Sequence, residues 1–186
     1  MLAKAHIGVE EYLRLVFDDR PEPDYVDGEV VERALPTPKH SRTQALLIML
    51  FARLIGPFGL ILQPELRLRI SDRRFRVVDF AVFQGKKPEG RYATNPALVA
   101  IEILSPDERR GRLLAKLEDY RQWGVRYIWV VDPQAKRLSE YSEAGLVRCS
   151  TLSLPEFEFE IFRRRIVQGH LVPFTTVSGL FPLPFS

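Results

Sequence analysis

Two carboxylates and one amine stand out in the sequence, because each falls where a charge is costly unless it has a partner. Asp79 lies within the apolar run 77–83, and Glu102 lies within the apolar run 97–104. A carboxylate in a hydrophobic strand must be paired, hydrogen-bonded or bound to a metal ion. Lys116 follows in a helical pattern, at the border of its apolar stripe. We therefore predict that Asp79, Glu102 and Lys116 meet in one site.

The chemistry predicted for this site is hydrolysis of a phosphodiester. Two carboxylates on neighbouring strands supply oxygen ligands, which suit Mg²⁺ and also Mn²⁺. Such an ion polarises a phosphate and lowers the pKa of a bound water. The ammonium of Lys116 would stabilise the charge of a pentavalent phosphorane or orient the attacking water. Asp79 and Glu102 are thus the predicted metal ligands.

Each of the three residues also has a structural interpretation. Asp79 would cap a β-bulge, Glu102 would pair with an arginine, and Lys116 would extend its ammonium to the edge of the sheet. The arginines available to Glu102 are Arg69, Arg76 and Arg91. Any one carboxylate alone is weak evidence, and it is the combination of three residues that favours a catalytic site.

Two polar residues at the start of a predicted helix, 42–55, are secondary candidates. His40 and Gln44 are four residues apart and would share a face at the N-terminal end of the helix, where phosphate binding is favourable. Capping by His40 or Ser41 is the alternative. We favour the interpretation that His40 and Gln44 cap or solvate the helix end.

Two glutamates complete the candidate set. Glu65 lies on the polar face of a predicted strand, 60–70, where it would add a third carboxylate to the metal site. A salt bridge to Arg67 or Arg76 explains the position of Glu65 equally well. Glu29 follows a hairpin turn, and we expect it to be exposed.

The elements that position these residues form a mixed α/β pattern. Asp27-Gly28 predicts a type I′ turn and hence an N-terminal hairpin. A strand–helix–strand unit inside a run of consecutive strands predicts a mixed sheet with helices on its faces. The predicted order is helix 9–17, hairpin 25–31, helix 42–55, strands 60–70, 77–83 and 97–104, helix 111–123, strand 125–131, hairpin 137–152 and strand 157–161.

Five stretches resemble the PD-(D/E)xK nuclease superfamily and, more closely, an uncharacterised restriction-endonuclease-like branch of it. They are residues 25–29, 77–82, 101–106, 116–120 and 124–133. The resemblance covers residues 8–162 and implies a restriction-endonuclease-like core, here with an extra N-terminal hairpin. It also implies a Mg²⁺-dependent endonuclease acting on DNA, in which Asp79 and Glu102 bind the metal and Lys116 is the catalytic lysine.

The chain departs from the superfamily motif at two positions. Val78 stands where the motif has a proline before the aspartate. Leu104 stands where the motif has its lysine, two residues after the glutamate. The resemblance therefore places the whole lysine role on Lys116. Because function depends on the site, the resemblance is stronger for fold than for activity.

Length and composition limit the remaining choices. We expect one domain, 1–186, with the apolar tail 163–186 used in packing or in contacts within a homo-oligomer, most simply a dimer. A single cysteine excludes an internal disulfide and a cysteine zinc cluster. No signal peptide and no apolar run of the roughly 20 residues that span a bilayer is evident, so we expect a cytoplasmic protein without membrane contact.

The charge distribution permits DNA as a partner without requiring it. The net charge is only +3. Basic runs occur at 67–76, 109–112 and 163–165, and the first two flank the predicted site and would contact phosphates. The alternative function is a catalytically inactive nucleic-acid-binding or self-associating module of the same fold. A small-molecule phosphodiesterase using the same residues is a third hypothesis.

Overall fold

The computed structural model describes residues 6–17, 21–163 and 166, and it contains one large sheet with helices on both faces. The helices are α1 (Val9–Arg14), α2 (Pro38–Ala52), α3 (Ile55–Phe58), α4 (Arg110–Trp123) and the 3-10 turn η1 (Pro155–Phe157). The strands are β1 (Asp24–Val26), β2 (Glu29–Val31), β3 (Leu60–Ser71), β4 (Arg74–Gln84), β5 (Val99–Ile103), β6 (Tyr127–Asp132), β7 (Arg137–Ser142), β8 (Gly145–Cys149), β9 (Thr151–Leu154) and β10 (Phe159–Phe162).

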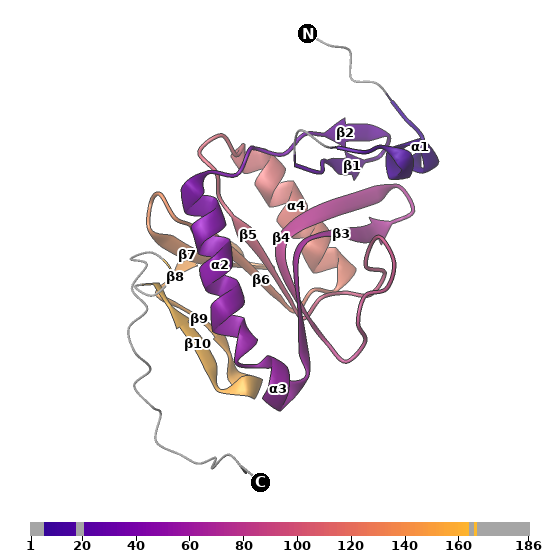
Figure 1. Ribbon diagram of the computed structural model, residues 1–186. Helices are drawn as coiled ribbons and strands as arrows, with labels where there is room; N and C mark the ends of the chain where they lie inside the picture. The colour runs from indigo at the N-terminus through magenta and orange to yellow at the C-terminus, as the bar shows by residue number, and fades with distance from the viewer. Residues whose placement is uncertain (1–5, 18–20, 164–165, 167–186) are drawn as a thin grey trace.

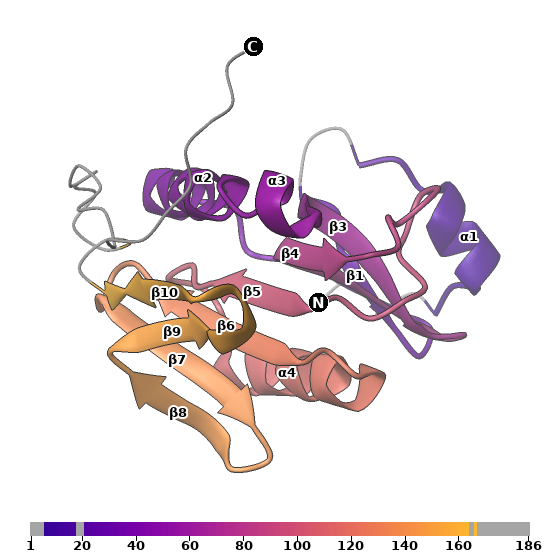
Figure 2. The same cartoon turned by 90° about the horizontal axis from the view of Figure 1, so that it is seen from below.

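The large sheet has eight strands in the order β2-β1-β4-β5-β6-β7-β8, with β3 paired to β4 off this path. Among the described strands, β5 and β6 are the only pair that runs parallel, and α4 connects them. Figure 2 shows α2 on one face of the sheet and α4 on the other, with the β9–β10 hairpin as a small separate sheet beside them (Figure 2). The predicted mixed α/β fold with helices on the sheet faces is confirmed.

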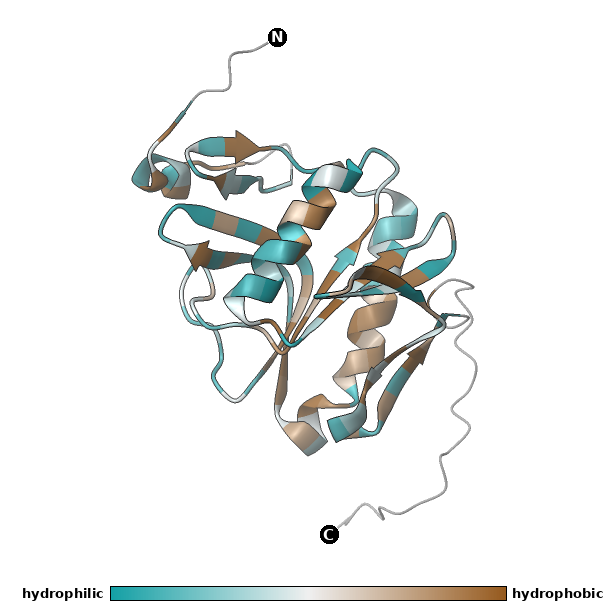
Figure 3. Cartoon of the chain, turned by 180° about the vertical axis from the view of Figure 1, so that it is seen from behind, coloured by the Kyte–Doolittle hydropathy of each residue, from teal (hydrophilic) through white to brown (hydrophobic). Residues whose placement is uncertain are grey.

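Two apolar clusters hold the helices to the sheet. On one face, Leu47 and Phe51 of α2 pack around the fully buried Trp129 of β6. On the other, Leu117 and Tyr120 of α4 pack against the opposite side of the central strands. Figure 3 shows these central strands as largely hydrophobic, whereas hydrophilic and hydrophobic residues alternate along α4 (Figure 3). The predicted amphipathic helix thus has one buried face, and Gly124 ends it with a left-handed φ of 98°.

The predicted N-terminal hairpin is present and forms one edge of the large sheet, where β1 pairs with the start of β4. Asp27 and Gly28 both have positive φ angles, as a type I′ turn requires. A third apolar cluster consists of the aromatic residues Tyr12, Tyr25 and Phe75, and it joins α1 and the hairpin to the start of β4. Figure 1 shows α1, β1 and β2 grouped at one end of the molecule, away from the β9–β10 hairpin (Figure 1).

The predicted start of the second helix was wrong by four residues. The helix begins at Pro38, and Thr37 caps it by accepting a hydrogen bond from the backbone N–H of His40 at 3.2 Å. Proline suits the first helical turn because that turn needs no N–H donor there. His40 and Gln44 therefore lie inside the helix and do not cap it. None of the described helices is long and apolar enough to cross a membrane.

Candidate active site

The candidate site lies where β4 changes pairing partners. On the side away from β3, residues 80–82 pair with β5, whereas Arg74 and Phe75 pair with β1. We call the intervening residues 76–79 the β4 junction. Buried backbone groups at such a gap need other partners. Asp24 accepts a hydrogen bond from the N–H of Val77 at 2.8 Å, and the ammonium of Lys116 donates to the Val77 carbonyl at 2.8 Å.

Lys116 and Glu102 form a direct ion pair at this junction. Lys116 Nζ lies 2.7 Å from Glu102 Oε2, and both side chains are buried. The hydroxyl of Tyr120 donates to the other carboxylate oxygen, Oε1, also at 2.7 Å. Lys116 and Tyr120 are four residues apart and share one face of α4. The interpretation that Lys116 extends to the edge of the sheet is therefore wrong, and so is the pairing of Glu102 with an arginine.

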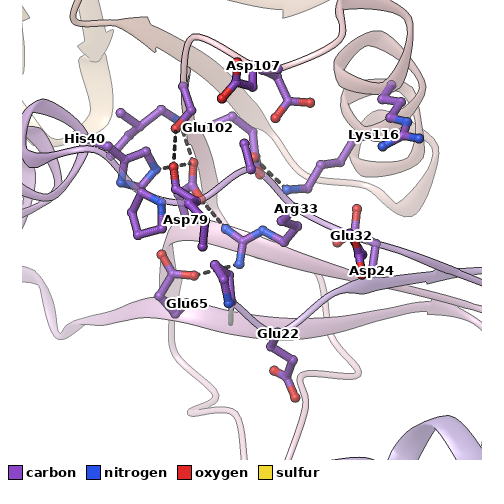
Figure 4. A pocket seen from close by; sticks show the side chains of 18 of the residues that line it. Glu22, Asp24, Glu32, Arg33, His40, Glu65, Asp79, Glu102, Asp107 and Lys116 are labelled. Atoms are coloured by element: carbon purple, nitrogen blue, oxygen red, sulfur yellow. Dashed lines mark hydrogen bonds and ion pairs between the residues drawn. The ribbon is translucent and has the colours of Figure 1, made fainter. Parts of the chain in front are cut away.

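Asp79 is held by groups from three different segments. Its Oδ2 accepts a hydrogen bond from the backbone N–H of Ile103 at 2.7 Å and lies 3.2 Å from His40 Nε2 on α2. Its Oδ1 pairs with the guanidinium of Arg33, which comes from the segment between β2 and α2. Figure 4 shows these side chains converging on Asp79 (Figure 4). Asp79 and Glu102 both line one cavity of about 780 Å³, together with Lys116.

Glu65 also belongs to the site, at a position where the pairing of β3 with β4 is interrupted. Pro64 pairs with Phe80 and Leu66 with Val78, but the position between them, where Glu65 faces Asp79, is unpaired. Glu65 has a left-handed φ of 49°, which costs a non-glycine residue about 1–2 kcal/mol. Its carboxylate accepts hydrogen bonds from Arg33 at 2.8 Å and from Gln44 at 2.9 Å. The predicted bridges from Glu65 to Arg67 or Arg76 do not form.

The pKa values of the two central acids, Asp79 and Glu102, are shifted in opposite directions. Burial raises the pKa of Asp79, but the hydrogen bond from His40 and the charges of Arg33 and Lys116 outweigh it and lower the pKa to about 2. Burial raises the pKa of Glu102 to about 7, against the charge of Lys116. Burial alone would lower the pKa of Lys116, but the carboxylates around it, Glu102 first, raise it. Lys116 is thus a cation at neutral pH.

Of the remaining secondary candidates, His40 and Gln44 lie at the site and Glu29 does not. His40 bonds to the Asp79 carboxylate, and Gln44 Nε2 donates to the Asp79 carbonyl at 2.7 Å as well as to Glu65. The interpretation of His40 and Gln44 as caps or solvated residues is wrong, because both are aimed into the site. Glu29 is only half-buried in β2 and does not belong to the described lining of the cavity.

Three residues at the site were not identified from the sequence. Arg33 lies in an irregular segment with no periodicity to mark it. Tyr120 lies in the apolar stripe of its helix, and nothing in the sequence distinguishes its hydroxyl from an ordinary buried tyrosine. Asp24 sits in a short strand, and only the spatial proximity of β1 to β4 reveals its bond to Val77.

In the first basic run, 67–76, Arg67, Arg74 and Arg76 form ion pairs within the protein. The prediction that this run contacts phosphates is therefore wrong for these three arginines. Arg76 is buried and bonds to Asp24 at 3.0 Å and to Asp119 at 2.7 Å, and Arg74 reaches the same Asp119 at 2.8 Å. Arg67 is buried between Glu22 and the ring of Tyr12. In the second run, Arg109 and Arg112 line the cavity.

The donor set of the site suits a divalent cation of the oxygen-binding type. Asp79 and Glu102 supply carboxylate oxygens from rigid strands, and Mg²⁺ takes few protein ligands while keeping several waters. Each carboxylate pairs with a cationic side chain, Asp79 with Arg33 and Glu102 with Lys116. Within the described residues, no group of three or more His, Cys, Asp or Glu side chains is arranged to hold a metal ion.

Comparisons with known proteins agree with this fold. A family model, Uma2, described as "Putative restriction endonuclease", matches residues 9–161. A crystal structure of a putative nuclease belonging to DUF820 from Anabaena variabilis superposes with a TM-score of 0.77 at 20% sequence identity, covering 87% of this chain and 98% of that one. No curated protein sequence gives a significant match. The expected restriction-endonuclease-like architecture is confirmed.

Proposed function

Because the chain belongs to the Uma2 family of putative restriction endonucleases, we propose that it is a metal-dependent endonuclease that hydrolyses DNA phosphodiester bonds. The observation that carries this proposal is the meeting of three residues far apart in sequence. Asp79 of β4, Glu102 of β5 and Lys116 of α4 line one cavity. A buried lysine next to two buried carboxylates is costly to maintain for stability alone, since apolar residues would pack there as well.

In the proposed mechanism Asp79 and Glu102 hold the divalent ion, with Mg²⁺ as the expected ion and Mn²⁺ as a substitute. When bound, the ion supplies charge stabilisation at the phosphate and a more acidic water. Tyr120 and the backbone N–H of Ile103 fix the two carboxylates in position, since each donates to one of them at 2.7 Å. Rigid ligands of this kind keep the substrate phosphate in a productive position.

Lys116 acts as a cation in this mechanism and not as a base, because its pKa is raised. An ammonium has three N–H donors. Glu102 and the Val77 carbonyl accept two of them, which leaves one for a group in the cavity. That donor stabilises negative charge on the phosphate as it develops, or orients the attacking water.

Cleavage of supercoiled plasmid DNA in the presence of Mg²⁺ or Mn²⁺ tests the proposal. We expect Asp79→Ala and Lys116→Ala to lower the cleavage rate by about 100-fold or more while the protein stays folded. Lys86→Ala is the matched control for Lys116→Ala, since it removes the same charge from an exposed loop position and should leave the rate unchanged. Cleavage that survives both site substitutions refutes the assignment of these residues, whereas no cleavage by the unaltered chain favours a non-catalytic DNA-binding or self-associating module.

We also propose that the active protein is a homo-oligomer, most simply a dimer. The support is compositional, because the tail 163–186 is rich in apolar residues and proline, and such ends rarely stay solvated. Most of this tail lies outside the described residues. Light scattering should give a mass near twice the 21.5 kDa of the chain, and a monomer mass would exclude the dimer.

A further inference from the structure

The carboxylates of Glu65 and Asp79 lie side by side, and this arrangement needs a cation between them. The two residues face each other across the unpaired position of the β3–β4 ladder. Like charges directly opposite each other on neighbouring strands are destabilising. The strained φ of 49° at Glu65 adds a further cost. The chain therefore maintains this pair of acids at the expense of stability, which suggests that the pair has a function.

Arg33 is the cation that now occupies this position. Nη1 lies 2.8 Å from Glu65 Oε2, and Nη2 pairs with Asp79 Oδ1, so a single guanidinium bridges both acids. The side chain is only 13% exposed. The other oxygen of Asp79 is already occupied by the Ile103 N–H and by His40. Figure 4 shows the guanidinium of Arg33 reaching both Glu65 and Asp79.

We propose that Arg33 is a resident cation of the site, and that a divalent metal ion binds to Asp79 only as the guanidinium leaves it. This inference rests on the proposed function in one respect, the assignment of Asp79 as a metal ligand. A metal ion in direct contact with Oδ1 would lie beside the guanidinium, and the repulsion between the two positive charges opposes their binding to the same oxygen. Arg33 is the group that can move, since it sits in an irregular segment, whereas Asp79 is fixed in a central strand.

The consequence is that Arg33 sets the metal affinity of the protein. Without metal it neutralises two neighbouring carboxylates and stabilises the folded chain. With metal, the cost of breaking its two charge-assisted hydrogen bonds is subtracted from the binding free energy. Arg33 is thus a positioning residue for the two acids and a competitor of the ion. A residue with only a structural role would lower stability when removed without tightening metal binding.

The test is calorimetric titration of the purified protein with Mn²⁺, in the absence of DNA. Arg33→Ala should bind Mn²⁺ about 10-fold more tightly than the unaltered chain, because the lost pair no longer competes. In EDTA the same variant should melt at a lower temperature, and Mn²⁺ should raise its melting temperature by more than that of the unaltered chain. Arg33→Lys keeps the charge but cannot bridge both acids, so its affinity should be intermediate.

Arg112→Ala provides the matched control. Arg112 lines the same cavity but is exposed, and within the described chain it forms no ion pair with Glu65 or Asp79. Its removal changes the net charge equally and should tighten Mn²⁺ binding much less. Equal or weaker Mn²⁺ binding by both Arg33 variants overturns the inference, as does the absence of Mn²⁺ binding in every variant.

The failures of the two proposals are distinguishable. Tighter Mn²⁺ binding by Arg33→Ala with no DNA cleavage by the unaltered chain supports the resident cation and removes the proposed nuclease function. Metal-dependent cleavage that requires Asp79, combined with unchanged Mn²⁺ affinity in Arg33→Ala, supports the nuclease and removes the resident cation.

Discussion

At the scale of single residues, the site is a set of charges that are buried and each matched by a specific partner. Asp79 binds Arg33 and His40, and Glu102 binds Lys116. Removing one partner of a buried pair leaves the other uncompensated, which costs more than an exposed pair would. The site is therefore expected to be sensitive to substitution even where no reaction is measured.

The low pKa of Asp79 predicts how its contribution to stability depends on pH. Its pKa of about 2 in the folded chain is below that in the unfolded chain, so the folded state binds fewer protons. The contribution of the Asp79 carboxylate to the free energy of unfolding is therefore fully present above the pKa of the unfolded state. It is lost as the pH falls through the pKa of the folded state. In EDTA we expect Asp79→Asn to cost about 2 kcal/mol of unfolding free energy at neutral pH, and progressively less toward pH 2.

Urea unfolding of Asp79→Asn at several pH values measures this dependence. Asp72→Asn is the control, because its exposed carboxylate pairs only with Arg69 at the surface and should show little cost at any pH. A cost of Asp79→Asn that does not change between neutral and acid pH would contradict the assigned environment of Asp79.

At the scale of elements, the position of α4 relative to β4 determines where Lys116 lies. One turn after Lys116, Asp119 bonds to both Arg74 and Arg76 of β4, and Arg76 continues to Asp24 of β1. This buried network joins three elements around the β4 junction. We expect this network to hold the Lys116 ammonium at the carboxylate of Glu102.

Asp119→Ala should weaken both stability and activity. Arg76 would remain buried with only one carboxylate, and breaking such a pair costs about 3 kcal/mol. The plasmid cleavage rate should also fall, because α4 would lose its ion pairs to Arg74 and Arg76 of β4. Glu118→Ala is the control at the neighbouring helical position, where the carboxylate pairs with Arg121 and makes no bond to β4. Equal effects of the two substitutions on urea unfolding and on rate would contradict the proposed function of the network.

The sequence predicted these elements better than it predicted their contacts. Helical periodicity identified α4, because its buried stripe repeats with the helical period up to Gly124. The strands β4 and β5 were identified because both are continuous apolar runs. The break opposite Glu65 could not be predicted, since it depends on which strand pairs with β4.

From the sequence, Asp79, Glu102 and Lys116 were expected to meet, and they line one cavity. His40 and Gln44 were named only as secondary candidates, and Arg33 was missed. Asp79, Glu102 and Lys116 were identifiable because charged residues in apolar segments contradict the local pattern. Arg33 gave no such signal, since an arginine in a polar connecting segment is ordinary. Its partners become evident only when the segment between β2 and α2 is seen to cross the cavity.

At the scale of the whole molecule, the charge pattern limits how DNA would bind. The net charge is only +3, and Arg67, Arg74 and Arg76 are used in internal pairs. The basic residues left to face a phosphate backbone at the cavity are few, with Arg109 and Arg112 the principal ones. DNA affinity should therefore depend on a small number of phosphate contacts and only moderately on salt.

Replacing Arg109 and Arg112 together with alanine tests this view. Affinity for DNA should fall by a similar factor for all sequences, and the slope of log affinity against log salt should decrease by about 2. Lys86→Ala combined with Lys87→Ala is the control, because it removes two charges from an exposed loop after β4. Fluorescence anisotropy in EDTA measures binding without cleavage. An unchanged slope in the arginine variant would place the DNA elsewhere on the surface.

We propose that Asp79 and Glu102 together bind a divalent ion beside Lys116. The most direct measurement is a crystal structure of the protein soaked in Mn²⁺, with anomalous diffraction recorded to locate the ion. We expect an anomalous peak within metal–oxygen bonding distance of both carboxylates, with the guanidinium of Arg33 displaced from Asp79. A manganese-soaked crystal with no peak at these two acids, and with Arg33 still bridging Asp79 and Glu65, would contradict the assignment of Asp79 and Glu102 as metal ligands.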